Sequence, residues 1–425
     1  MAIGAAAPHS NREAPAQRED RPAARVESPE GRNMRSIVSS TTHFNDADRM
    51  LRDLIIDIPD LPPAESVGFL ACASQSNHDA LAGALQKALP FPVVGGTTLR
   101  SPFAPREEDV GASLTVLSRP GLRYAIGVSG EPKAGGEREL MEKLHRDCTV
   151  SLGAAPALFL LIMPILPNLM AGDYLKHLFS LAGRVPVFGG MVSDDFDSDR
   201  FAVFAGGRAY QDRMVMVGIG GSVDPVFSVG CRMTALSGYR PTVTEADGNI
   251  IRRVDTMTFC EFLTRMGFPE DVRLLSDFTL CVSIEGGVSA RDGIPEITHL
   301  ARTDPESGSG FFGSDIPEGS RISLGVLRPE DVVGSAAHCI GEMAAAMRAR
   351  EAAGYEFGMA FCLPCVGRYY AMLGRDNEEG RMLREAFSAV PLFGYYGFNE
   401  ICPSHDTDGR RFNRQYSDSM VICAL

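Results

Sequence analysis

Three short polar segments of this chain carry the side chains best suited to binding a small molecule. Thr97-Thr98, Ser193-Asp194-Asp195 and Asn399-Glu400 each come shortly after an apolar run that ends in glycine. Carboxylates accept hydrogen bonds from an ammonium group, hydroxyls both donate and accept, and glycine lets backbone amides approach a ligand. The three segments could therefore form a ligand site, or they could be ordinary solvated turns.

Two cysteines could carry a different chemistry. Cys362 and Cys365 have the CxxC spacing of a zinc half-site or a redox pair. A zinc site would need further ligands, for which Cys402 and His405 are available downstream, and a redox pair would need a helix that lowers the pKa of a thiol. Two reduced core or turn cysteines are the favoured interpretation, and a thiol enzyme that uses Cys365 is the alternative.

A glycine-rich segment has the glycine spacing of a nucleotide-binding motif but not the flanking elements that such a motif requires. Residues 308–313 read Gly-Ser-Gly-Phe-Phe-Gly. Pyrophosphate binding requires a strand before this pattern and a helix after it, whereas an acidic loop precedes it here and an Ile-Pro-Glu-Gly stretch follows. The segment is predicted to be a hairpin loop. No GxxxxGK[ST], GxSxG or HExxH motif occurs, so no catalytic or metal-ligating residue is predicted, and a binding protein is favoured over an enzyme.

An internal repeat places the three polar segments at equivalent positions. The stretch 91–96, Phe-Pro-Val-Val-Gly-Gly, recurs at 185–190 as Val-Pro-Val-Phe-Gly-Gly and at 390–394 as Val-Pro-Leu-Phe-Gly. An apolar run and a helix-like segment precede each copy, and a polar loop and another apolar run follow it. This predicts a repeated strand-helix-strand-loop-strand unit, with the glycines at the turn where a strand gives way to a loop.

The helix-like segments support this alignment. Four apolar positions in the first copy match four in the second at a constant offset of 94 residues, with the i, i+3, i+4, i+7 spacing of a stripe that faces a sheet. The matched positions are Leu81, Ala84, Leu85 and Ala88, with Leu175, Leu178, Phe179 and Ala182. Leu178 and Phe179 are therefore expected to be buried.

Composition limits the fold and the partners. A chain of 425 residues that is 44% apolar is long enough for two cores. We expect an α/β fold with mixed sheets, in two layered domains at 36–230 and 231–425, after a disordered tail at 1–35. The net charge of −13 argues against a nucleic-acid partner, and no apolar run is long enough for membrane insertion. Scattered cysteines without a signal peptide are typical of a cytoplasmic protein.

The motifs, taken in their order along the chain, resemble the FIST family of bacterial signal-transduction sensors. The segments that carry the resemblance to the FIST N domain are 92–98, 189–195 and 203–207, and those for the FIST C domain are 243–250, 316–320, 365–368 and 393–401. The resemblance implies a cytoplasmic module that binds a small molecule such as an amino acid. It implies a separate signalling partner, namely a histidine kinase, a diguanylate cyclase or a chemoreceptor. Some members resemble haem-binding nitric oxide sensors, so haem is the alternative ligand.

The predicted ligand site combines the three polar segments with one arginine. Arg368 could hold a carboxylate in a bidentate fork, and the acidic side chains could receive an ammonium, which would suit an amino acid. Asp194, Arg368 and Glu400 are expected to line one pocket or neighbouring pockets. The full set of predicted ligand-binding residues is Gly96, Thr97, Gly190, Asp194, Asp195, Arg368, Asn399 and Glu400.

Overall fold

The structure is a computed structural model. It describes residues 35–43, 46–103, 110–165, 169–194, 200–272, 279–286, 289–373, 375 and 377–425. The predicted tail at 1–35 lies outside these ranges except for its last residue, and the predicted site residue Asp195 lies outside them as well. Within these ranges the chain forms helices and mixed sheets, which confirms the predicted α/β class.

Most of the chain is built from three units with one topology. In each unit two strands run parallel, a helix connects them, and two antiparallel strands complete the sheet. The first unit contains β1 (Arg35–Thr41), α1 (Ala47–Ile55), β2 (Ser66–Ala73), α2 (His78–Ala88), β3 (Val93–Thr98) and β4 (Ala112–Ser118), with the short 3-10 helix η1 (Pro63–Glu65) before β2. The second contains β5 (Leu122–Val128), α3 (Glu137–Leu152), β6 (Pro156–Met163), α4 (Ala171–Ala182), β7 (Val187–Met191) and β10 (Val215–Gly221). The third contains β11 (Val226–Cys231), α7 (Pro329–Ala352), β20 (Ala360–Pro364), α9 (Glu378–Ala386), β21 (Leu392–Gly394) and β24 (Ser419–Ala424).

The strand orders show that the units are equivalent. They read β1-β4-β2-β3, β5-β10-β6-β7 and β11-β24-β20-β21. The predicted repeat is therefore confirmed, and each unit is longer than predicted, because it begins with a further strand and helix. We refer to these three units together as the body.

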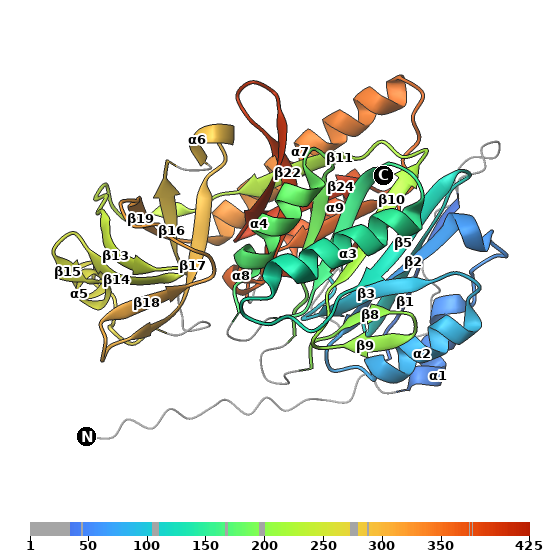
Figure 1. Cartoon of the computed structure of the whole chain (residues 1–425), viewed down its shortest axis with the longest axis horizontal. Helices are drawn as coiled ribbons and strands as arrows, with labels where there is room; N and C mark the ends of the chain where they lie inside the picture. Colours follow the sequence, from blue (N-terminus) through green and yellow to red (C-terminus); the bar gives the residue numbers. More distant parts are fainter. Residues whose placement is uncertain are drawn as a thin grey trace.

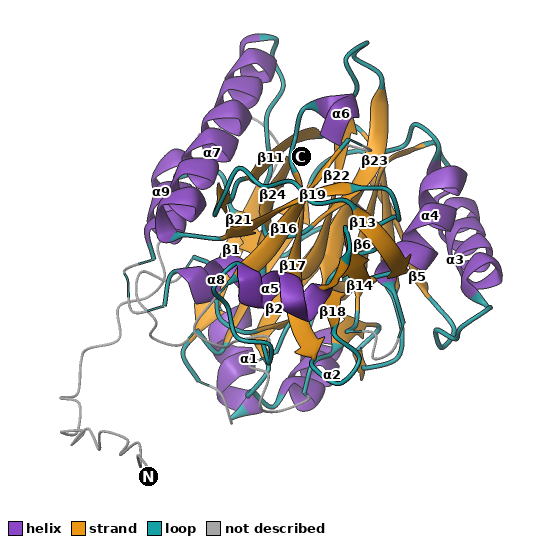
Figure 2. Cartoon of the chain, turned by 90° about the vertical axis from the view of Figure 1, so that its left-hand side faces the viewer, coloured by secondary structure: helices purple, strands orange, loops and turns teal. Residues whose placement is uncertain are grey.

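The three sheets pack face to face around one apolar core, and the helices cover their outer faces. Phe69 of β2, Phe188 of β7 and Phe361 of β20 meet in this core, with the rings of Phe69 and Phe361 4.8 Å apart. Three helix pairs, α1 with α2, α3 with α4, and α7 with α9, surround the strands (Figure 2). Leu178 of α4 is buried, as the helical stripe predicts, whereas Phe179 beside it is only half-buried.

Each of the first two sheets is extended by a hairpin from a later part of the chain. The hairpin of β8 (Val203–Ala205) and β9 (Arg208–Tyr210) pairs with β3 of the first sheet. The hairpin of β22 (Phe398–His405) and β23 (Arg411–Tyr416) pairs with β7 of the second sheet. The division of the chain at 230/231 stays a prediction, and the sheets do not follow it, because β22 and β23 lie beside strands of the N-terminal half.

The two double glycines lie inside strands β3 and β7 and not in turns, so that part of the prediction was wrong, whereas Gly394 is the last residue of β21. Gly189 is in β7, at φ 142°, and a Cβ there would lie 1.9 Å from the carbonyl oxygen of Leu161 in the parallel strand β6. The equivalent distances at Gly95 and Gly394 are 1.8 and 1.9 Å. Glycine is required here because the neighbouring strand leaves no room for a side chain.

An additional antiparallel sheet is inserted between β11 and α7. It contains β12 (Thr234–Ala235), β13 (Val243–Asp247), β14 (Ile250–Val254), β15 (Met257–Thr258), β16 (Leu280–Glu285), β17 (Glu296–Asp304), β18 (Ser309–Phe312) and β19 (Arg321–Val326), with α5 (Phe259–Arg265) and α6 (Ser289–Asp292). This inserted sheet stands to one side of the body (Figure 1). The glycine-rich segment at 308–313, predicted to be a hairpin loop, instead contains strand β18, and the loop of the β17–β18 hairpin precedes the strand.

Among the described residues, no helix combines the length and the apolar character needed to cross a membrane.

Candidate functional site

The three polar segments that follow the repeated strands do meet in the structure. Ser193, after β7, is fully buried, and its Oγ accepts a hydrogen bond from Leu99 N at 3.0 Å and donates one to Tyr396 O at 2.5 Å. Thr98 Oγ1 accepts a hydrogen bond from Tyr396 N at 3.0 Å. The segments after β3, β7 and β21 are therefore tied together at one buried junction.

Several of the predicted site residues pack against this junction. Thr97 Oγ1 accepts a hydrogen bond from Ala202 N at 3.0 Å. A Cβ on Gly96 would lie 2.2 Å from Val192 Cγ1, and one on Gly190 would lie 3.3 Å from Phe398 O, so both glycines allow the segments to approach closely. Asp194 is buried next to Ser193. Ligand contact by these residues stays a prediction.

Arg368 is fully buried, and its hydrogen bonds go to the protein itself. It lies in the short helix α8 (Val366–Ala371), where Nε and Nη2 donate to Glu379 Oε1 at 3.0 and 2.6 Å. Nη1 donates to Ser335 Oγ and Asp418 O, and Nη2 also donates to Val332 O. An arginine has five N–H donors, and all five have acceptors here. The fork predicted to hold a ligand carboxylate is thus filled by Glu379.

Two buried acids lie next to one another beside Arg368. Glu400 in β22 is completely buried, and Asp418, between β23 and β24, is 2% exposed. Ser419 Oγ donates to Glu400 Oε2 at 2.9 Å, and the thiol of Cys365 lies 3.9 Å from Asp418 Oδ1. Burial, together with the nearby Asp418, raises the pKa of Glu400 to about 8, and burial also raises the pKa of Asp418. Glu400 therefore keeps its proton at neutral pH.

The same region holds polar oxygens that lack hydrogen bonds. Within the described residues, four buried oxygens have no hydrogen bond of normal geometry, although Cys365 lies near Glu400 and Ser404 lies near Tyr416. They are Asn399 Oδ1, Glu400 Oε1, Asp418 Oδ2 and the Tyr416 hydroxyl. Asn399 and Asp418 also have left-handed backbones, with φ of 51° and 54°. Buried polar atoms in folded proteins nearly always have a partner, and strained backbone concentrates at functional sites. These four oxygens, which we call the acceptor cluster, therefore mark a candidate binding region.

A cavity of about 160 Å³ adjoins the acceptor cluster, between the body and the inserted sheet. It lies among the start of α4, the start of β17, the turn after β18 and the end of β23. Its lining residues are Met170, Gly172, Pro295, Glu296, Ile297, Ser314, Asp315, Arg414, Gln415, Tyr416 and Ser417. Tyr416 lies opposite Glu400 in the β22–β23 ladder, and Ser417 immediately precedes Asp418. We call this cavity the cleft cavity.

None of the seven predicted ligand-binding residues that the structure describes lines the cleft cavity, and sequence reasoning missed Tyr416 and Ser417. The available signal was the polar stretch at 415–419, Gln-Tyr-Ser-Asp-Ser, between two strand-like runs. Asn399 and Glu400 were predicted, and they contribute two oxygens of the acceptor cluster.

A buried ion pair fixes the inserted sheet to the body at the cleft cavity. Arg414 Nη1 of β23 donates to both carboxylate oxygens of Asp292, at 2.6 and 2.7 Å, and to Ile294 O. The side chains of Arg414 and Asp292 are 4% and 0% exposed. Because Asp292 belongs to α6, the pair holds the two walls of the cavity together.

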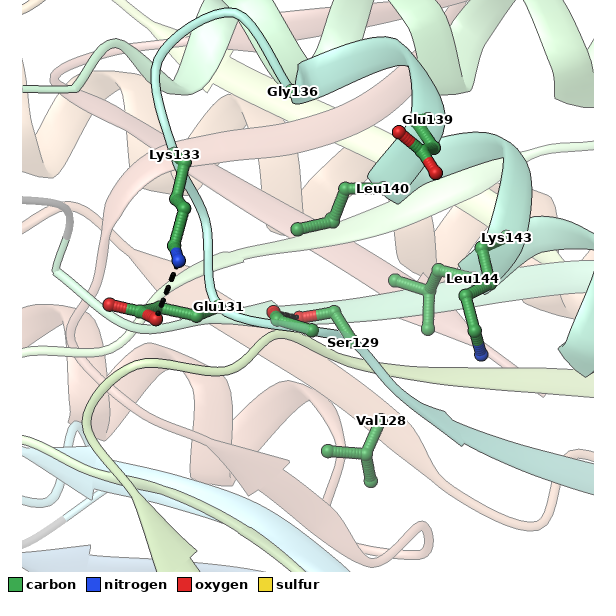
Figure 3. A pocket seen from close by; sticks show the side chains of 10 residues that line it. Val128, Ser129, Glu131, Lys133, Gly136, Glu139, Leu140, Lys143 and Leu144 are labelled. Carbon is green, nitrogen blue, oxygen red and sulfur yellow. Dashed lines mark hydrogen bonds and ion pairs between the residues drawn. The ribbon is translucent and has the colours of Figure 1, made fainter.

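A second cavity, of about 240 Å³, lies between the end of β5 and the first turns of α3 (Figure 3). Its charged side chains are exposed, and Lys133 pairs with Glu131 at 3.3 Å. Ser129 is buried there, but its hydroxyl accepts from Met214 N and donates to Gly130 O. Among the described residues that line it, this cavity lacks a buried polar group that needs a ligand, so the cleft cavity is the better candidate.

The structure bears on two alternatives from the sequence, a reactive or metal-binding thiol and a haem site. Burial raises the pKa of both Cys362 and Cys365 well above the usual range, which is the opposite of what a nucleophile or a metal-binding thiolate requires. The described residues contain no cluster of three metal-ligating side chains. Neither cavity is lined by a histidine or a cysteine, so these cavities do not fit a haem with such an axial ligand.

Comparisons with known proteins agree with the motif pattern. A model of the FIST N domain matches residues 66–257, and a model of the FIST C domain matches residues 259–403. No curated protein sequence matches the chain. Among solved structures, a cyanuric acid hydrolase from A. caulinodans is 9% identical over 92% of this chain and 98% of that chain, with a TM-score of 0.35. A likeness this distant carries no inference about function.

Proposed function

The chain belongs to the FIST family, and on that basis we propose that it is a sensory protein that binds a small molecule in the cleft cavity. FIST domains are associated with small-ligand sensing in signal transduction. The proposed ligand site lies where the FIST C residues of β17 and the turn after β18 meet α4 of the FIST N match. Cavities between structural units are common sites for small ligands.

One observation carries this proposal. Tyr416 is 4% exposed and lines the cleft cavity, and within the described residues its hydroxyl lies near Ser404 but has no hydrogen bond of normal geometry. A phenol buried in this state loses hydrogen bonds to water without replacing them. A ligand that supplies the missing bond would be favoured at this position.

The acceptor cluster could transmit the effect of ligand binding to the rest of the protein. Tyr416 pairs with Glu400 across the ladder, and the β22–β23 hairpin is also paired with β7 of the second unit. The Arg414–Asp292 pair links the same hairpin to the inserted sheet. We propose that ligand binding shifts the inserted sheet relative to the body and that a separate cytoplasmic protein reads this change. A histidine kinase, a diguanylate cyclase or a chemoreceptor would suit this role.

Most residues predicted to contact the ligand have a supporting role in this proposal. Gly96, Thr97 and Gly190 shape the junction, and Arg368 with Glu379 fixes the backbone of Asp418. Asn399 and Glu400 contribute two oxygens of the acceptor cluster. Arg368 was predicted to bind the carboxylate of an amino-acid ligand, but it is already paired with Glu379.

A ligand screen by thermal shift tests the proposal, since binding to the folded state raises the melting temperature. We expect at least one small polar compound to stabilise the wild type and to stabilise Tyr416→Phe much less. Tyr210→Phe, on the edge strand of the first sheet, is the matched control and should keep the full response. An equal response of all three proteins would place the ligand elsewhere.

A further inference from the structure

We infer that the inserted sheet is a hinged lid over the cleft cavity. It opens about its two connectors to the body, and the Arg414–Asp292 pair latches it in the closed position that the structure shows. This inference rests on the proposed function, because it names how access to the proposed ligand site is controlled. It follows from the separate core of the inserted sheet, from the place of its connectors and from the charge pairs at the latch.

The inserted sheet is built as a separate unit. The described residues of its apolar core lie between 236 and 326, among them Phe259, Val282 and Leu324. Within the described residues, its strands pair with one another and not with strands of the three body sheets. Ile294 packs against the core of the body. Units with separate cores move relative to one another unless a large apolar interface joins them.

The two connectors to the body lie side by side. Residues 232–233 join β11 to β12, and residues 327–328 join β19 to α7. Because Thr234 of β12 pairs with Val326 of β19, the connectors leave the inserted sheet from neighbouring strands. A unit attached by two short adjacent connectors can rotate about the line through them, as in hinge-bending proteins.

One buried carboxylate holds both connectors to α7. Asp331 is 3% exposed, and its Oδ2 accepts hydrogen bonds from Thr234 Oγ1 at 2.7 Å and from Arg328 N at 3.3 Å. Its Oδ1 lies 3.3 Å from Arg232 Nε. Asp331 therefore ties both connectors to the first turn of α7 and marks the axis of the hinge.

The cleft cavity lies between the connectors and the latch. Cys231, directly before the first connector, donates from its thiol to Ser417 O at 3.6 Å, and Ser417 lines the cavity. Arg414 lines the cavity three residues earlier, where it binds Asp292 of the inserted sheet. Opening about the connectors would therefore widen the cavity and give a ligand access to Tyr416.

The contacts at the latch are charge pairs. Asp292 holds Arg414 with both carboxylate oxygens, and beside it Arg291 lies 3.9 Å from Asp406 and stacks over the ring of Phe412. The Arg414–Asp292 pair is buried between β23 and the inserted sheet. A variant that keeps one partner leaves a buried charge without a counter-ion, and opening would return that charge to water. Loss of either partner therefore favours the open state.

Double electron–electron resonance on the full chain without a ligand measures the opening. Spin labels on Ser180→Cys in α4 and Thr256→Cys, beside β15 at the far end of the inserted sheet, span the cleft cavity (Figure 1). A second pair, Ala235→Cys with Ala337→Cys, lies beside the connectors and should move much less. A third, Ser180→Cys with Lys87→Cys, lies within the body and should not move. All five positions are exposed, whereas the native cysteines are buried or half-buried, and mass spectrometry verifies where the labels are.

We expect one distance between labels 180 and 256 in the wild type, and a second, longer distance in Asp292→Asn and in Arg414→Met. Loss of one partner of the buried pair should raise the open-to-closed ratio at least about 100-fold. From a minor state of about 0.1–10%, open molecules should then exceed about one tenth of the total. The double variant of Arg414→Met and Asp292→Asn leaves no charge at the latch and should return to the wild-type distance.

The matched control is Arg350→Met, which breaks a half-exposed pair with Asp224 in the body and should leave every distance unchanged. If Asp292→Asn and Arg414→Met keep the wild-type distance while their melting temperatures fall, the pair only stabilises the fold and the hinge is overturned. If the pair at 235 and 337 lengthens as much as the pair at 180 and 256, the axis is not at the connectors. Where a variant does not fold, Arg414→Lys, which keeps the charge but not the fork, decides by the same criterion.

The hinge and the proposed ligand site can fail separately, because no ligand is present in these measurements. If the inserted sheet opens but no compound gives a Tyr416-dependent thermal shift, the proposed function is overturned and the hinge stands. If a compound gives that shift but the latch variants stay closed, the hinge is overturned and the ligand site stands.

Discussion

Glu400 and Tyr416 face each other directly across the antiparallel ladder of β22 and β23. Partners in such a ladder have Cβ atoms about 5 Å apart on one face of the sheet. The carboxyl group of Glu400 is completely buried, whereas Tyr416 lines the cleft cavity. An occupant of the cavity would therefore lie one side chain away from a buried acid that is protonated at neutral pH.

Glu400 should make the protein less stable as the pH rises. Its pKa is about 8 in the folded chain and near 4.5 when unfolded, so the folded state holds one more proton between these values. Folding stability from this group is therefore lost between about pH 4.5 and 8, at about 1.4 kcal/mol per pH unit. Glu400→Gln should remove this part of the slope when urea unfolding is followed across this pH range. The exposed Glu385→Gln is the control, and a variant slope equal to that of the wild type would show that Glu400 ionises normally.

Arg368→Met should destabilise the protein by about 3–5 kcal/mol, because it leaves Glu379 buried without a counter-ion. Arg381 forms a comparable pair with Glu385 at 3.0 Å, but both side chains are more than half exposed. Arg381→Met should therefore cost less than about 1 kcal/mol. Urea unfolding at neutral pH measures both variants, and equal losses would contradict the structural role of the buried pair.

Gly189→Ala should cost at least about 2 kcal/mol, because the new Cβ would collide with Leu161 O and the backbone has a positive φ. At Gly341 in α7, an added Cβ would have no other atom within 4 Å, so Gly341→Ala should be neutral or stabilising by up to about 1 kcal/mol. Thermal and urea unfolding measure both. A tolerated Gly189→Ala would show that β6 and β7 leave room for a side chain between them.

Cys365 should resist alkylation by iodoacetamide near neutral pH as long as the protein is folded. Its side chain is 1% exposed, and burial raises its pKa well above the usual range, so the reactive thiolate is scarce. Mass spectrometry after brief labelling should find Cys365 modified only when urea is present. Rapid labelling of Cys365 in the native protein would restore the thiol-enzyme alternative.

The local part of the fold could be predicted from the sequence. Leu81 and Leu175 recur with the same helical spacing, and the double glycines recur at the same offset, so the units were recognisable. The exchange of hairpins between units could not be recognised in the sequence, because the pairing of Phe398 with Met191 joins segments 207 residues apart. No periodicity within either segment encodes that register.

The candidate site was predicted only in part for the same reason. Asn399 and Glu400 follow a repeated strand, which drew attention to them, and the structure places both in the acceptor cluster. Arg368 looked available for a ligand because its partner Glu379 is 11 residues away, on a different helix. Tyr416 lines the cavity only because the inserted sheet packs against β23, and no local pattern in the sequence encodes that packing.

The exchange of hairpins between units has a consequence for synthesis on the ribosome. When the residues up to β10 have emerged, β7 still lacks its neighbour β22. Once β11 and β20 have followed, the third sheet still lacks β24 between them. An unpaired strand edge is prone to aggregate, and pairing between distant segments is slow. The body can therefore close only after β22–β24 have been translated, and until then the edge of β7 stays without its neighbouring strand.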